Sequence, residues 1–92
     1  DQVDGIAAAS DLIAMNTVRA LADHGRLVPR DISVTGFDDL PLAEQTIPRL
    51  TTVSQNIAVG AQAMVEALYK RIAGEDAPSV EMDPVLVRRD TA

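Results

Sequence analysis

The chain has 92 residues, which is near the lower end of the range for one domain, so a complete two-lobed receptor does not fit within it. It is 47% hydrophobic and 24% charged, with one Phe, one Tyr and no Trp, a composition that predicts a globular protein with an aliphatic, alanine-rich core. The 14 acidic and 8 basic residues give a net charge of −6, which disfavours direct binding to nucleic acid.

The first elements predicted are a strand and a helix. Residues 3–9 form a nearly continuous run of small apolar side chains, typical of a strand that is covered on both faces. Ser10 is a good N-cap, and Asp11 complements the positive end of a helix dipole. Apolar residues then recur at helical spacing over 11–24, and Gly25 supplies the stop signal.

A second strand and a loop follow. Residues 32–37 alternate in polarity and are partly β-branched, which predicts a parallel strand reached by a right-handed crossover through the helix. Residues 40–49 contain two prolines and no regular period, so we expect a loop with a helical turn. A short strand is predicted over 50–54, where Gln55 and Asn56 end it.

The clearest predicted helix covers residues 58–73 and ends at Gly74. It carries an apolar stripe at helical spacing, made of Ala61, Val65, Leu68 and Ile72. After a turn, residues 80–89 are predicted to be extended, and Pro84 within them favours an edge position. The elements together predict the α/β class.

Two neighbouring acids, Asp38 and Asp39, follow the second predicted strand. Ligands of open α/β sheets bind at the carboxyl ends of the strands, where a carboxylate can accept hydrogen bonds from hydroxyls or ring N–H groups. The alternative is that both acids only solvate a strand end, since Asp is common in turns. For Ser10 and Asp11, the simpler interpretation is a helix cap and an acid that complements the helix dipole.

The chain offers little for catalysis or metal binding. His24 is the one histidine and there is no cysteine, so we expect it to contact carbonyls at a helix end instead of a metal or a catalytic triad. The hydroxyls of residues 51–54 have no neighbouring base and are interpreted as strand residues. Arg88 and Arg89 are interpreted as surface charges. No catalytic residue, metal site or cofactor is predicted, and an acid–base enzyme using the two acids is disfavoured.

Four segments resemble the C-terminal effector-binding region of the lactose-repressor (LacI/GalR) family of transcription regulators. They occur in the order and at the separations of that family: residues 9–14, 28–36, 36–43 and 51–55. The resemblance implies part of a two-lobe, type I periplasmic-binding-protein-like fold, with a parallel sheet and flanking helices. It also implies that residues 1–54 form a portion of the C-terminal lobe and that residues 55–83 are a segment of the other lobe. Residues 84–92 would be a strand that returns to the C-terminal lobe.

The resemblance also assigns site residues. Asp38 is expected to contact the ligand and Asp39 to brace the loop. Ser10 and Asp11 face the same crevice, although the family often has Asn where this chain has the shorter Ser10. The helix and the loop after the acids are expected to form a dimer contact that comprises Leu12, Met15, Arg19, Leu42 and Ile47. The alternative is that these residues pack within the domain, and for Leu12 the two interpretations are nearly balanced.

The expected function is therefore the effector-binding and dimerising part of a cytoplasmic transcription regulator. Its partners would be a sugar or similar small polar effector and a second copy of the chain, and it would reach DNA only through a domain outside this sequence. No membrane segment or leader is predicted, since there is no long apolar run and no basic region at residues 1–4. The alternative is a piece of an exported sugar-binding protein that serves a transporter.

Overall fold

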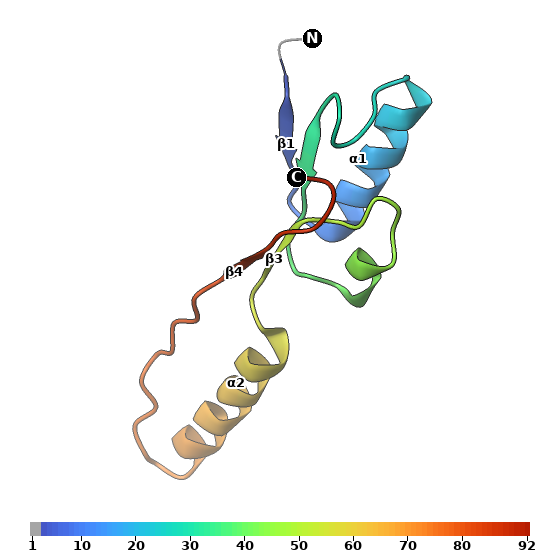
Figure 1. The fold of residues 1–92 in the computed structure, drawn as a ribbon. Helices are drawn as coiled ribbons and strands as arrows, with labels where there is room; N and C mark the ends of the chain where they lie inside the picture. The colour runs from blue at the N-terminus through green and yellow to red at the C-terminus, as the bar shows by residue number, and fades with distance from the viewer. Residues whose placement is uncertain (1–2) are drawn as a thin grey trace.

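The computed structural model describes residues 3–92, which form an elongated molecule of 59 × 26 × 18 Å. In Figure 1 one end holds β1, β2, α1 and η1, while α2 forms a separate arm that the pair β3 and β4 joins to the rest. The elements in chain order are β1 (Gly5–Ala7), α1 (Asp11–Asp23), β2 (Ser33–Thr35), the 3-10 turn η1 (Pro41–Glu44), β3 (Thr52–Ser54), α2 (Ile57–Ile72) and β4 (Val85–Val87).

The sheet that supports the core is parallel, as predicted. β1 pairs with β2 in register Ile6 to Val34, and Thr35 forms a parallel bridge with Thr51 just before β3. α1 packs on β2, and the buried core between them and the following loop consists of Ala14, Val34, Ala43 and Leu50. The prediction that the first strand is covered on both faces is wrong: Gly5 and Ala7 are exposed, because α1 packs on this sheet and no other helix of residues 3–92 covers it.

α1 begins and ends where the local sequence predicts. The Ser10 hydroxyl oxygen accepts the N–H of Ile13 at 3.2 Å, which confirms the N-cap. At the other end, Nδ1 of His24 lies 2.9 Å from the carbonyl oxygen of Ala20, so the predicted contact with helix-end carbonyls is confirmed. Gly25 then adopts φ of +75°, a left-handed conformation that favours glycine and stops the helix.

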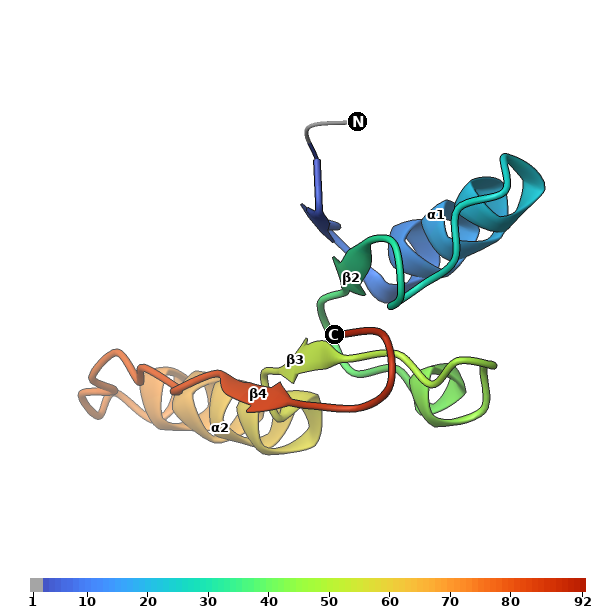
Figure 2. The same cartoon turned by 45° about the horizontal axis from the view of Figure 1, so that its top comes forward.

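The predicted second helix is confirmed as α2, but it has no buried residue. Three members of its apolar stripe are 53%, 58% and 70% exposed: Val65, Leu68 and Ile72. The chain that returns from α2 runs beside it in both orientations (Figures 1 and 2), and Met82 lies close to Gly60. The stripe itself therefore has no sheet to pack on within residues 3–92.

The end of the chain returns to the core. β4 pairs with β3 in antiparallel fashion, with Val53 opposite Leu86. Beyond β4, the N–H groups of Asp90 and Thr91 both donate to the carbonyl of Arg49. The guanidinium and then the backbone N–H of Arg49 hold the pKa of Asp90 below its ordinary value of 3.8. These bonds fix the C-terminal segment against the strand that leads into the arm.

Candidate functional site

The acid loop, residues 37–40, leaves the carboxyl end of β2. Asp38 and Asp39 have φ of 110° and 54°, a region in which residues other than glycine are uncommon and in which Asp is among the better tolerated. Backbone bonds hold this conformation, since the N–H of Asp38 donates to Val53 at 2.9 Å and the N–H of Asp11 donates to Phe37 at 3.0 Å. The loop is thus bonded both to the start of α1 and to β3.

The Asp38 carboxylate is half-buried on the rim between the core and the arm. Its Oδ1 accepts a hydrogen bond of 3.0 Å from Nε2 of Gln55, an exposed residue just before α2. Ser10 belongs to the same rim, because the residue after it is bonded to the acid loop. A hydroxyl that accepts a cap bond can still donate one. The predicted ligand contacts of Asp38 and Ser10 stay predictions.

Asp11 differs from both, since it is fully buried beneath the acid loop. Its Oδ1 accepts the hydroxyl of Thr52 at 2.5 Å, and its Oδ2 accepts the N–H of Leu40 at 2.6 Å. Both oxygens therefore have protein donors, and this geometry gives Asp11 a structural role. Its predicted contact with a ligand stays a prediction.

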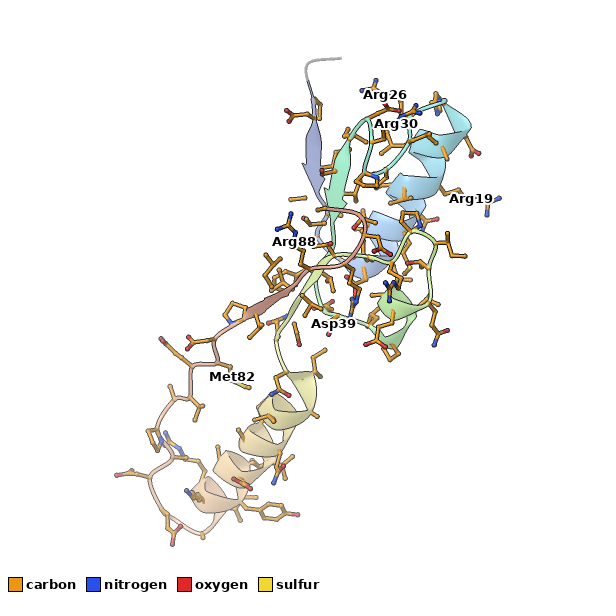
Figure 3. All side chains as sticks on the ribbon, in the orientation of Figure 1. Arg19, Arg26, Arg30, Asp39, Met82 and Arg88 are labelled. Carbon is orange, nitrogen blue, oxygen red and sulfur yellow. The ribbon has the colours of Figure 1, made fainter. Side chains whose placement is uncertain are left out.

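Asp39 braces the loop, as expected, through an arginine that follows β4. Nη2 of Arg89 lies 2.8 Å from Oδ1 of Asp39, and Nη1 donates to the carbonyl of Leu50 at 2.9 Å. The Arg89 side chain is 11% exposed, so the interpretation of Arg89 as a surface charge is wrong. Figure 3 shows Asp39 where the core meets the arm, with Arg88 on the chain just after β4.

The sequence did not predict a role in this site for three of its residues: Thr52, Gln55 and Arg89. A signal for Arg89 exists, because neighbouring side chains of an extended segment point to opposite faces. One of two consecutive arginines must then face inward, where it needs an acid. For Thr52 and Gln55 we find no comparable local signal.

An apolar groove lies on another side of α1, away from the acid loop. It has a volume of about 510 Å³ between α1 and the loop around residues 46–48. Three of the predicted dimer residues line it: Met15, Arg19 and Ile47. Leu12 and Leu42 do not line the groove but are also exposed, at 58% and 47%. Figure 3 shows Arg19 extending outward from α1.

Other kinds of site find no support in the described chain. Among residues 3–92, no three His, Asp or Glu side chains come together in a way that could hold a metal ion. No helix in that range has both the length and the apolar character needed to cross a bilayer.

Comparison with known proteins identifies the family. Residues 2–92 match the model of the periplasmic binding protein-like domain. The chain belongs to this family. The domain is similar to the HTH-type transcriptional regulator MalR of Streptomyces coelicolor, with 42% identity over 90 residues that cover 95% of the chain and 26% of the regulator. It thus spans about a quarter of this relative's length.

Solved structures agree with the fold of this periplasmic binding protein-like domain. The complex of the transcriptional regulator CelR with cellobiose superposes with a TM-score of 0.90 at 36% identity, covering 98% of this chain and 28% of that one. A LacI-family regulator from Arthrobacter sp. FB24 in complex with lactose gives 0.86 at 34% identity, with coverages of 98% and 35%. The resemblance to the LacI/GalR family and the predicted fold class are both confirmed.

Proposed function

We propose that the chain is the C-terminal part of the effector-binding and dimerisation domain of a LacI-family transcriptional regulator, called the parent regulator below, which senses a sugar or similar small polar molecule. The observation that carries this proposal is the acid loop. Asp38 holds a half-buried carboxylate at the carboxyl end of a parallel sheet, where such folds bind ligands, and it does so in an unfavourable backbone conformation. The similar regulators solved with cellobiose and lactose support it.

In this proposal Asp38 accepts hydrogen bonds from ligand hydroxyls, and the Ser10 hydroxyl donates or accepts another. A carboxylate is suited to this because it only accepts, and a pair of neighbouring hydroxyls offers two donors. The Gln55 amide already donates to the Asp38 carboxylate at 3.0 Å. A ligand at Asp38 would therefore either displace this amide or bind beside it. Gln55 lies two residues before α2, so a ligand bound to Asp38 also acts on the start of the arm.

The parent regulator would have its two lobes on either side of this site. Residues 1–54 and 84–92 form part of the C-terminal lobe, and residues 55–83 belong to the other lobe. The pair β3 and β4 is then the crossing, and a sheet from outside this chain covers the exposed stripe of α2. A ligand that bridges the lobes favours their closed arrangement, which changes DNA affinity by linkage.

The remaining partners follow from the surfaces. The groove between α1 and residues 46–48 would pack against a second copy to form a homodimer, with the exposed Leu12 and Leu42 as further contacts. DNA contact would occur only through a domain outside the chain, which is consistent with the net charge of −6. We propose a cytoplasmic regulator without catalytic activity, because the relatives are HTH-type transcriptional regulators.

The proposal is tested by Asp38→Asn in the parent regulator. Asn lacks the charge and presents an NH₂ to ligand donors, so we expect a loss of about 1.5–3 kcal/mol, which is about tenfold or more in affinity. Calorimetric titration with cellobiose, lactose and glucose measures it. Asp76→Asn, at an exposed position in the turn after α2, is the matched control and should bind as the wild type does. Equal affinity of the Asp38 variant for the sugar that binds would remove Asp38 from the site.

A further inference from the structure

The proposed ligand contacts do not involve the carboxylate of Asp11, which is fully buried. We propose that Asp11 is a positioning residue that fixes the acid loop to β3, so that ligand binding by Asp38 depends on a side chain that does not touch the ligand. The predicted effect on sugar affinity rests on the proposed function. The predicted effect on the loop does not.

The hydrogen bonds require a group that only accepts. Oδ2 faces the N–H of Leu40 in the acid loop, and Oδ1 faces the hydroxyl of Thr52 in β3. The Thr52 oxygen also accepts the N–H of Asp39 at 3.4 Å, so its one hydrogen is directed to Asp11. An asparagine at position 11 would turn its NH₂ toward one of these donors in either orientation. One donor would then lose its acceptor in a buried place.

The surroundings of Asp11 leave no room for adjustment. It is 0% exposed, and a Cβ added to Gly36 would collide with its Oδ1. Its backbone N–H is bonded to Phe37 at 3.0 Å, just before the two acids. The first residue of α1 therefore makes three bonds, two to the acid loop and one to β3, and water has no space to replace them.

These bonds set where the loop stands relative to the strand that continues into the arm. Arg89 holds the other side of the loop through Asp39 at 2.8 Å. Asp38 lies between these two anchors, and its own side-chain bond goes to the exposed Gln55. If Asp11 releases Leu40 or Thr52, the loop can move relative to β3 and the Asp38 carboxylate loses its orientation.

The experiment compares four variants of the parent regulator: Asp11→Asn, Thr52→Val, Thr52→Ser and the control Asp23→Asn. Calorimetry with cellobiose, lactose and glucose gives the dissociation constant, and NMR gives the amide shift and hydrogen exchange of Leu40. We expect Asp11→Asn and Thr52→Val to lose about tenfold or more in affinity and to expose the Leu40 amide to exchange. Thr52→Ser keeps the hydroxyl and should match the wild type. Asp23 is an exposed carboxylate at the other end of α1, and its variant should also match.

Each result decides the proposal. A lower melting temperature of Asp11→Asn with unchanged affinity and Leu40 exchange would assign Asp11 a merely stabilising role and overturn it. If that variant does not fold, equal affinities of Thr52→Val and Thr52→Ser would overturn it instead. If the wild type binds none of the three sugars, the proposed function fails for these sugars and the affinity readout is silent on Asp11, while the Leu40 amide in the Thr52 pair still decides whether the hydroxyl–carboxylate bond holds the loop.

Discussion

The substitution Gly36→Ala is expected to cause a severe loss of stability. The added Cβ would collide with Oδ1 of Asp11 and would lie 3.0 Å from Cδ2 of Leu50 and 3.2 Å from Cα of Asp11. Gly36 is buried, and its N–H donates to Thr51 at 2.9 Å, so the backbone cannot shift without breaking the ladder. Overpacking of a core costs about 1–3 kcal/mol, and leaving the buried donors of Leu40 and Thr52 without their acceptor costs about 1–3 kcal/mol each.

Domain stability is only about 5–15 kcal/mol, so this single methyl group removes much of it. Urea unfolding followed by circular dichroism measures the loss. Gly5→Ala is the matched control, because the nearest atom to its added Cβ is the carbonyl oxygen of Ser33 at 4.0 Å. Equal unfolding midpoints for the two variants would show that Asp11 is not packed against Gly36 as described.

The second large effect concerns the isolated chain of 92 residues, which we expect to self-associate. α2 has no buried residue, and Val65, Leu68 and Ile72 are each more than half exposed. Burying such a side chain contributes about 1.5–3 kcal/mol, so several together drive association. The groove lined by Met15 and Ile47 offers a second apolar contact.

An association free energy of about −8 kcal/mol corresponds to a dissociation constant of about 1 μM. Sedimentation velocity at about micromolar protein concentration therefore tests this expectation. Leu68→Gln should weaken association because it removes an apolar member of the stripe. Gln62→Ala changes a side chain outside the stripe and serves as the control. A compact monomer that unfolds cooperatively at every concentration would contradict the expectation, and would mean that α2 has folded back onto its own sheet.

The elements that depend on local chemistry could be predicted from the sequence. Ser10 and Gly25 mark the ends of α1 because capping and left-handed turns involve only nearby residues. The spacing of apolar residues likewise gave α2 to within one residue at each end. Asp38 and Asp39 were placed at a strand end because the strand before them has a recognisable pattern.

What could not be predicted depends on distant residues. Thr52 meets Asp11 across 41 positions, and Arg89 meets Asp39 across 50, so no local pattern encodes either contact. The partners of Thr52 and Arg89 are set by how the strands are arranged in space. The exposure of β1 was missed for a related reason, since covering a strand depends on elements that residues 3–92 do not place there.

The most direct test of the proposed function measures operator affinity of the parent regulator by fluorescence anisotropy, with and without cellobiose, lactose and glucose. The DNA probe is the region upstream of the regulator's own gene. We expect one of these sugars, or a close analogue found by calorimetry, to change the dissociation constant for DNA by about fivefold or more, a coupling of about 1 kcal/mol. Asp38→Asn should need a higher sugar concentration for the same change. An operator affinity that no sugar alters in the wild type would contradict a sugar-responsive regulator.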